Sequence, residues 1–200
     1  MINEIISKKK VSTKRKISTK QITIIGMLNA ITIILGVTGI GFLPIPPFKT
    51  TIMHIPVIIG SIAEGPIVGG FTGFLFGIFS IFQAINTPSP VSFIFMNPIV
   101  AVLPRVLIGI FPYYIYKLIK RKSEYFGIVI GAAAGSFTNT LGVLSMIYIF
   151  YINQYADALH ISYNTAVKTL IPLVANGFIS AAAAIIITLP VILILNKIRA

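Results

Sequence analysis

One cationic residue lies inside an otherwise apolar helix candidate. The stretch from Asn97 to Lys117 reads NPIVAVLPRVLIGIFPYYIYK, with Arg105 near its middle. A guanidinium keeps its proton under ordinary conditions, so an arginine inside a membrane needs an anion, a water-filled cavity or carbonyl partners to offset its desolvation. We expect the few acidic residues to lie at or beyond the membrane edges. We therefore interpret Arg105 as a group that binds a negative or strongly polar ligand from outside. The acidic residues are Glu4, Glu64, Glu124 and Asp157.

Two amide residues share the expected depth of Arg105. With a rise of about 1.5 Å per residue, Arg105 lies roughly 9 Å below the outer membrane edge. Asn139 and Asn176, in two other expected spans, each lie at about 10 Å, for a hydrocarbon core of about 30 Å. The sequence therefore predicts a pocket that opens to the outside, with Arg105 at its floor.

Further residues are expected around this pocket. Most small-molecule sites combine apolar or aromatic walls with a few fixed polar groups. The polar candidates are Gln83 and Asn97 at the outer ends of neighbouring segments, His54 early in a short apolar run, and Lys49 in the loop before it. The aromatic candidates are Phe93, Phe95 and Tyr148.

Each polar candidate also has a purely structural interpretation. Arg105 could extend its guanidinium to the outer headgroups. Asn139 and Asn176 could form hydrogen bonds between helices that stabilise the bundle. His54 on its own is more often a structural residue than a ligand-binding one. These alternatives remain open at the level of the sequence.

The composition is that of an integral membrane protein. Of 200 residues, 56% are hydrophobic and 10% are charged, and the mean hydropathy is +0.95, whereas soluble domains carry about 25% charged residues. The length allows about six spans of roughly 20 residues. The net charge of +12 does not indicate nucleic-acid binding, because the basic residues stand between apolar segments. We expect an all-α bundle of six transmembrane helices in residues 21–200, preceded by a basic tail in residues 1–20.

The spans are delimited by prolines, glycines and charge clusters. LPIPPFK ends the first span, because three prolines in four positions cannot continue a helix. Residues 52–63 are too short to cross a bilayer unaided, so this segment is the weak point in the expected number of six spans. We expect residues 85–98 to form a loop and residues 151–168 an interfacial segment. The expected spans are 21–42, 52–63, 67–84, 97–117, 125–150 and 169–195.

The basic residues orient the chain. Seven lie in the tail, four in residues 117–122 and two at the C-terminal end, whereas only Lys49 and Lys168 fall on the other side. By the positive-inside rule both termini are cytoplasmic, which requires an even number of crossings.

Catalytic machinery is missing from the sequence. No two acidic residues stand close together, the only histidines are His54 and His160, and there is no cysteine. The chain has no GxxxxGK[ST] phosphate loop, so it cannot hydrolyse ATP by that route. We expect no enzyme activity and no cofactor, and any energy for transport to come from a partner.

Two stretches carry a family resemblance. TTIMHIPVIIGSIAEGPIVGGFTGFLFGIFS, followed after a proline-rich loop by LPRVLIGIFPYYIYK, resembles the substrate-binding S components of energy-coupling factor (ECF) vitamin transporters, most closely the pantothenate type. The resemblance implies a high-affinity vitamin-binding subunit in the bacterial plasma membrane. It also implies a separate transmembrane coupling subunit and two ATPase subunits as partners.

The resemblance also suggests roles for single residues. Family members dock through small residues in the first helix, often Ala-x-x-x-Ala, and Gly26 and Ala30 match that spacing here, although such a pair is equally expected from packing within the bundle. Pantothenate carries a carboxylate, which we assign to Arg105, together with hydroxyl and amide groups, which we assign to Asn139, Asn176 and Asn97. The alternatives are another vitamin (pyridoxine, riboflavin or folate), a stand-alone secondary transporter, and, less well matched, a membrane enzyme.

Overall fold

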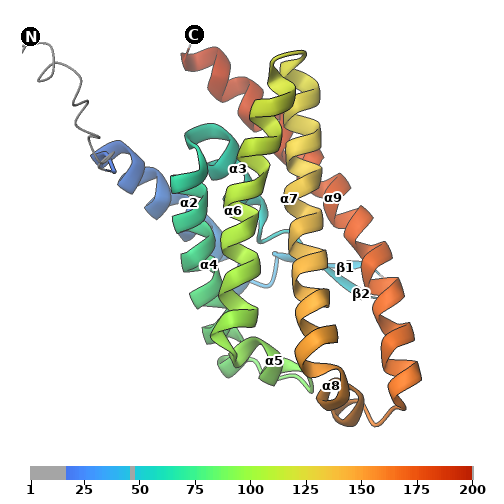
Figure 1. The fold of residues 1–200 in the computed structure, drawn as a ribbon. Helices are drawn as coiled ribbons and strands as arrows, with labels where there is room; N and C mark the ends of the chain where they lie inside the picture. Colours follow the sequence, from blue (N-terminus) through green and yellow to red (C-terminus); the bar gives the residue numbers. More distant parts are fainter. Residues whose placement is uncertain (1–16, 46–47, 200) are drawn as a thin grey trace, which may run out of the picture.

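The chain folds into a bundle of membrane-length helices, seen in a computed structural model that describes residues 17–45 and 48–199 (Figure 1). Five helices are long and apolar enough to cross a membrane, and a sixth apolar helix is shorter. This confirms the expected all-α membrane bundle. The helices are α2 (Thr19–Val37), α3 (Ile55–Glu64), α4 (Pro66–Asn86), α5 (Ser92–Met96), α6 (Pro98–Lys120), α7 (Glu124–Met146), α8 (Ile152–Ala158) and α9 (Tyr163–Arg199), with a π-helical turn, η1 (Ile147–Tyr151), between α7 and α8.

The first span is shorter than the sequence predicted. A capping box starts α2, in which Ser18 Oγ accepts a hydrogen bond from Gln21 N and Ser18 N donates one to Gln21 Oε1. The expected end at residue 42 is wrong, because α2 ends at Val37. Gly39 follows with φ +75°, a left-handed conformation that glycine adopts without strain and that stops the helix.

The expected break after the first span contains a β-hairpin. Strands β1 (Phe42–Ile45) and β2 (Phe48–Thr51) pair antiparallel, with Phe42 opposite Thr51. The hairpin lies against the middle of α9, where Ser180 Oγ donates a hydrogen bond to the Thr51 carbonyl at 3.1 Å. The sequence did not predict these strands, because a membrane chain seldom has partners for a lone hairpin.

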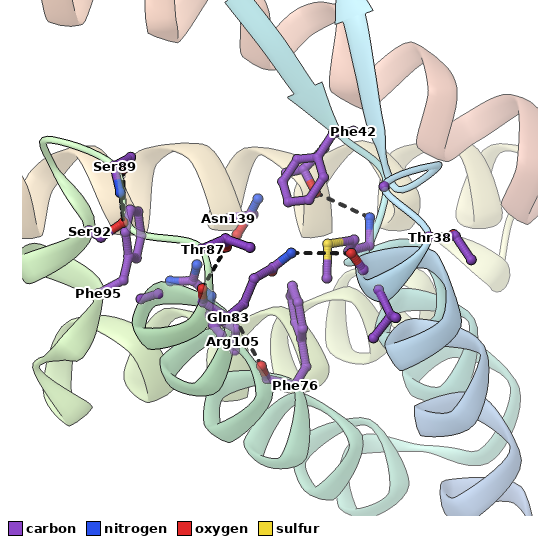
Figure 2. Close-up of a pocket in the computed structure, with 17 residues that line it drawn as sticks. Thr38, Phe42, Phe76, Gln83, Thr87, Ser89, Ser92, Phe95, Arg105 and Asn139 are labelled. Atoms are coloured by element: carbon purple, nitrogen blue, oxygen red, sulfur yellow. Dashed lines mark hydrogen bonds between the residues drawn. The ribbon is translucent and has the colours of Figure 1, made fainter.

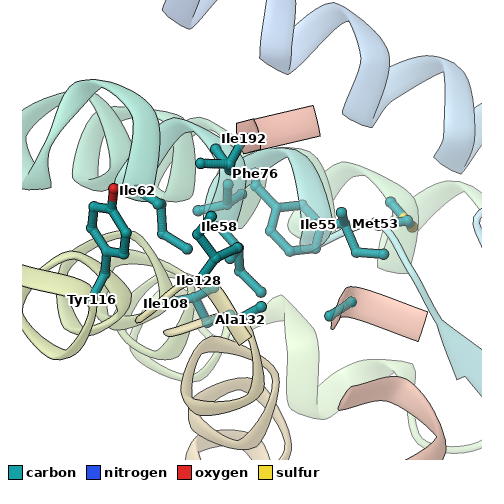
Figure 3. Packing of buried hydrophobic residues seen from close by; sticks show 12 residues of the cluster. Met53, Ile55, Ile58, Ile62, Phe76, Ile108, Tyr116, Ile128, Ala132 and Ile192 are labelled. Carbon is teal, nitrogen blue, oxygen red and sulfur yellow. The ribbon is translucent and has the colours of Figure 1, made fainter. Parts of the chain in front are cut away.

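The short second segment is a buried helix. With ten residues and a rise of about 1.5 Å per residue, α3 is roughly 15 Å long, about half a bilayer. Its interior position is clear from Val57 and Ile58, which are fully buried. Ile58 meets Ile108 and Ile128 in the main hydrophobic cluster (Figure 3). The segment therefore does not span the membrane by itself.

Glycines bring α4 and α6 into backbone contact. A Cβ added at Gly69 would overlap the Gly109 carbonyl oxygen, and one added at Gly73 would overlap the Arg105 carbonyl oxygen. Small residues allow this close approach of membrane helices. Pro104 lies inside α6 without ending it, as is tolerated in membrane helices. The bounds expected for these two spans differ from the structure by at most three residues.

The two segments expected to be irregular contain helices. Residues 85–98 include α5, and residues 151–168 include α8, so both loop predictions were wrong in part. Ile94 of α5 is fully buried in a second hydrophobic cluster. These short helices are held by tertiary contacts, which explains why the sequence pattern did not reveal them.

Both ends of the described chain lie at one end of the bundle. The α6–α7 turn and the end of α9 lie at this end, and α2 also begins toward it, to the left of them in the view (Figure 1). Arg199 binds Glu64 and donates to the Ala63 carbonyl, and Asn196 Nδ2 donates to Glu124 Oε1 at 2.6 Å. By the positive-inside rule, the basic residues of the α6–α7 turn predict that this end is cytoplasmic. The tail up to residue 16 lies outside the described residues.

Candidate ligand-binding site

A cavity of about 640 Å³ lies between α2, α4, α5, α6, α7 and the hairpin (Figure 2). Its volume falls in the range of small-molecule sites, which is about 300–1,000 Å³. The sequence predicted a pocket beside Arg105, and Arg105 is among the residues that line this cavity. The lining residues are Gly36, Val37, Thr38, Gly39, Phe42, Thr51, Met53, Phe76, Ser80, Gln83, Ala84, Thr87, Ser89, Ser92, Phe95, Arg105 and Asn139.

Arg105 lines this cavity and is buried inside the bundle. Only 7% of the residue is exposed. Its Nη1 donates a hydrogen bond to the Val100 carbonyl at 3.1 Å, and its Cζ lies 5.7 Å from the Phe76 ring centroid and 5.3 Å from that of Phe95. Aromatic faces attract a guanidinium, so the protein supplies part of what the buried charge needs.

The internal partners leave Arg105 incompletely satisfied. No acidic side chain pairs with it among the ion pairs of the described residues. Its buried Nε has no hydrogen-bond partner within the described part of the chain. A buried donor without a partner carries a desolvation cost, and that cost is larger for a charged group. The geometry therefore favours an anionic or strongly polar ligand at this place.

Asn139 of α7 supplies a complementary acceptor. It is 8% exposed and lines the same cavity. Its Oδ1 is buried and finds no donor among residues 17–45 and 48–199. An amide oxygen accepts hydrogen bonds only. The cavity thus offers a cationic donor on α6 and a free acceptor on α7, a combination that suits a ligand bearing both an anionic group and a hydroxyl or N–H group.

Gln83 joins two walls of the cavity. Its Nε2 donates a hydrogen bond to the Gly36 carbonyl at 3.3 Å, which connects α4 to the end of α2 (Figure 2). Arg105, Asn139 and Gln83 were all expected in the site from the sequence, and the structure brings all three to one cavity.

The other expected residues lie elsewhere. Asn97 caps α6, because its Oδ1 accepts from Ile99 N at 2.9 Å, and its Nδ2 donates to Tyr151 at 2.7 Å. His54 is fully buried, with Nε2 3.2 Å from Ser136 Oγ. Neither lines the cavity, and neither does Asn176, which is half-buried on α9.

Two further expectations concern side chains near the hairpin and the outer end. Lys49 lies in β2 opposite Pro44, and its side chain is outside what the structure describes. Of the aromatic candidates, Phe95 lines the cavity, Phe93 packs edge-to-face against Tyr151, and Tyr148 is half exposed.

Sequence reasoning did not identify several lining residues. Phe76 and Ser80 come from α4, Thr38 comes from the end of α2, and Phe42 is the first residue of β1. In an apolar membrane segment such residues look like packing positions. Phe76 lies four residues before Ser80, on one face of α4, and that spacing is the only signal in the sequence that would have grouped these two residues.

The chain is similar to known transport proteins. The family model "ECF transporter, substrate-specific component" matches residues 20–192. The chain is 32% identical, over 167 residues, to the pantothenic acid transporter PanT of Lactococcus lactis subsp. cremoris (strain MG1363), covering 76% of this chain and 81% of that protein. It is also 36% identical, over 63 residues, to the pantothenate transporter PanT of Leuconostoc mesenteroides subsp. mesenteroides, covering 31% of each chain.

Proposed function

Because this chain belongs to the family of substrate-specific components of ECF transporters, we propose that it is the subunit that captures pantothenate for an importer of this type. The family consists of transport components, so the chain is not an enzyme. Its apolar helices make it a multi-pass protein of the bacterial plasma membrane.

The observation that carries the proposal is the buried guanidinium in the cavity. Arg105 has a carbonyl and two aromatic rings around it, and its Nε is without a partner in the described chain. Pantothenate has one carboxylate, and an arginine binds carboxylates through short charge-assisted hydrogen bonds. The names of the two relatives support this choice of ligand over other vitamins.

Each polar residue of the cavity has a proposed role. The carboxylate of the ligand accepts hydrogen bonds from Arg105. Asn139 Oδ1 accepts from a ligand hydroxyl or amide N–H, and Gln83 holds the α2 side of the cavity in place and contributes its amide oxygen. The assignments of Asn97 and Asn176 to ligand contacts are given up, because neither residue lines the cavity.

Delivery across the membrane requires partners. We propose a separate transmembrane coupling subunit and two ATPase subunits, as the family resemblance implies, and the chain itself contains no GxxxxGK[ST] phosphate loop. Gly26 and Ala30 are exposed on α2, and nothing lies within 4 Å of a Cβ built at Gly26. This places the pair on the outer surface of the bundle, where a partner helix can approach closely.

Binding to purified protein tests the proposed ligand. Detergent-solubilised protein is analysed by mass spectrometry for a copurified small molecule, stripped of it, and titrated with pantothenate in a calorimeter. We expect tight one-to-one binding that Arg105→Ala abolishes without lowering the unfolding temperature. The control Arg121→Ala, at the cytoplasmic end of α6, should bind normally.

Three results would overturn the proposal. The first is tight binding of pyridoxine, riboflavin or folate without binding of pantothenate. The second is unchanged pantothenate affinity in Arg105→Ala. The third concerns the partners: pantothenate uptake by vesicles that contain only this chain, driven by an ion gradient, would indicate a stand-alone secondary transporter.

A further inference from the structure

The outer end of the bundle contains a π-helical turn with one tyrosine at its end. The turn η1 follows α7 directly and finishes at Tyr151. A π turn has more residues than an α turn, so side chains after it are rotated relative to a continuous α-helix, by about 100° for one extra residue. Such turns are frequent at functional sites. Neither the proposed ligand contacts nor the expected docking pair uses this feature.

Tyr151 holds both ends of α5. Its hydroxyl accepts a hydrogen bond from Asn97 Nδ2 at 2.7 Å, just after α5 ends. Its ring packs edge-to-face on Phe93, near the start of α5, with ring centroids 6.0 Å apart. Asn97 is at the same time the N-cap of α6. One side chain therefore connects the π turn, α5 and the start of the helix that carries Arg105.

The helix that Tyr151 holds is a wall of the cavity. Phe95 of α5 lies with its ring 5.3 Å from Arg105 Cζ, and Ser92 lines the cavity and bonds to Ser89 (Figure 2). Five residues are too few for a stable helix without tertiary contacts. The place of α5 is therefore set by its packing, to which the buried Ile94 contributes as well.

We propose that Tyr151 is a positioning residue for ligand binding: by holding α5 it keeps Phe95 against Arg105, and so sets how long the ligand stays in the cavity. This inference rests on the proposed function of the cavity. Tyr151 touches Asn97 and Phe93 and is not among the residues that line the cavity, so its effect on the ligand passes through α5.

The sharpest variant removes only the hydroxyl. Tyr151→Phe keeps the ring that packs on Phe93, and it leaves Asn97 Nδ2 without this acceptor. We expect the rate of pantothenate dissociation, measured by stopped-flow or surface plasmon resonance, to rise about 3- to 10-fold, as the loss of one neutral hydrogen bond gives. The association rate should change less than twofold. Tyr148→Phe, on the same π turn but half exposed, is the matched control and should change neither rate.

A double-mutant cycle tests whether the effect passes through α5. Phe95→Leu removes the aromatic ring that lies beside Arg105. We expect the effects of Phe95→Leu and Tyr151→Phe on the dissociation rate to be less than additive, because both variants loosen the contact between Phe95 and Arg105. Additive effects would overturn the proposal. So would a dissociation rate in Tyr151→Phe equal to that of the unmodified protein, which would mean that packing of Ile94 alone fixes α5.

Hydrogen exchange of the ligand-free protein separates this inference from the identity of the ligand. We expect the amides of residues 92–97 to exchange faster in Tyr151→Phe than in Tyr148→Phe, with the rest of the bundle unchanged. If pantothenate does not bind but this difference is seen, the proposed ligand fails and the positioning of α5 by Tyr151 stands. Equal exchange in the two variants would overturn the positioning role whatever the ligand is.

Discussion

The backbone carbonyl of Arg105 lies directly against Gly73, at a place that the Cβ of any other residue would occupy. The contact belongs to the α4–α6 crossing, and it fixes the height and rotation of the helix that carries the buried guanidinium. The position of the proposed ligand-binding charge therefore depends on the absence of a side chain on the neighbouring helix.

Gly73→Ala is expected to weaken both the fold and the binding site. The added methyl group forces α6 away from α4, and overpacking of this kind costs about 1–3 kcal/mol. The unfolding temperature in detergent should fall, and the dissociation constant for pantothenate should rise.

Gly70→Ala is the matched control on the same helix. A Cβ there meets only the Ile110 side chain at 3.7 Å, an ordinary contact. Equal losses in the two variants would contradict a specific role of the Gly73 contact.

Arg105 should determine whether the cavity prefers a charged ligand. We expect the unmodified protein to bind pantothenate about 10- to 100-fold more tightly than its neutral alcohol analogue, because a hydrogen bond to a charged group contributes roughly 1.5–3 kcal/mol. In Arg105→Gln the two ligands should bind about equally. Competition binding measures this ratio, and a preference for the carboxylate that persists in the variant would show that another group recognises it.

Asn139→Leu should weaken ligand binding without destabilising the protein. The variant removes the acceptor for a ligand donor, which is expected to raise the dissociation constant about 3- to 10-fold. It also removes a buried oxygen that lacks a partner in the described chain, so the unfolding temperature of the ligand-free protein should stay the same or rise.

Asn176→Leu serves as the comparison for Asn139→Leu. Asn176 lies outside the cavity, so its replacement should leave the dissociation constant nearly unchanged. The assignment of Asn139 would be lost if the two variants reduced the affinity equally.

Bulky side chains at Gly26 and Ala30 should block assembly and leave ligand binding intact. Both residues are exposed on α2, so leucine at either position adds volume on the outer surface only. Copurification with a coupling subunit and ATP-dependent uptake should be lost, while pantothenate titration of the isolated subunit should be unchanged.

Ile31→Phe provides the control for the docking pair. Ile31 is 42% exposed. Because successive residues of a helix point about 100° apart, its side chain lies on a different part of the α2 surface from Gly26 and Ala30. Normal assembly of the Gly26→Leu and Ala30→Leu variants would place the docking surface elsewhere.

Within its described residues the structure has five long helices and one shorter apolar helix where the sequence predicted six transmembrane helices. The helical membrane character was predicted correctly from the sequence alone, which also predicts a similar depth for Arg105 and Asn139. These properties follow from composition, charge distribution and a fixed rise per residue, all of which are local. For the same reason the bounds of α4 and α6 were predicted well. The end of α2 was not, because Gly39 reveals its left-handed conformation only in the structure.

Which of the residues expected at one depth face one another depends on the tertiary structure. Successive residues of a helix point about 100° apart, so depth does not fix direction, and Asn176 lies off the cavity that Arg105 and Asn139 share. The direction in which each side chain points depends on how the helices pack. The main contacts are the glycine contact between α4 and α6 and the hydrogen bond from Asn97, at the end of α5, to Tyr151. These contacts join segments far apart in the chain, which no local pattern specifies.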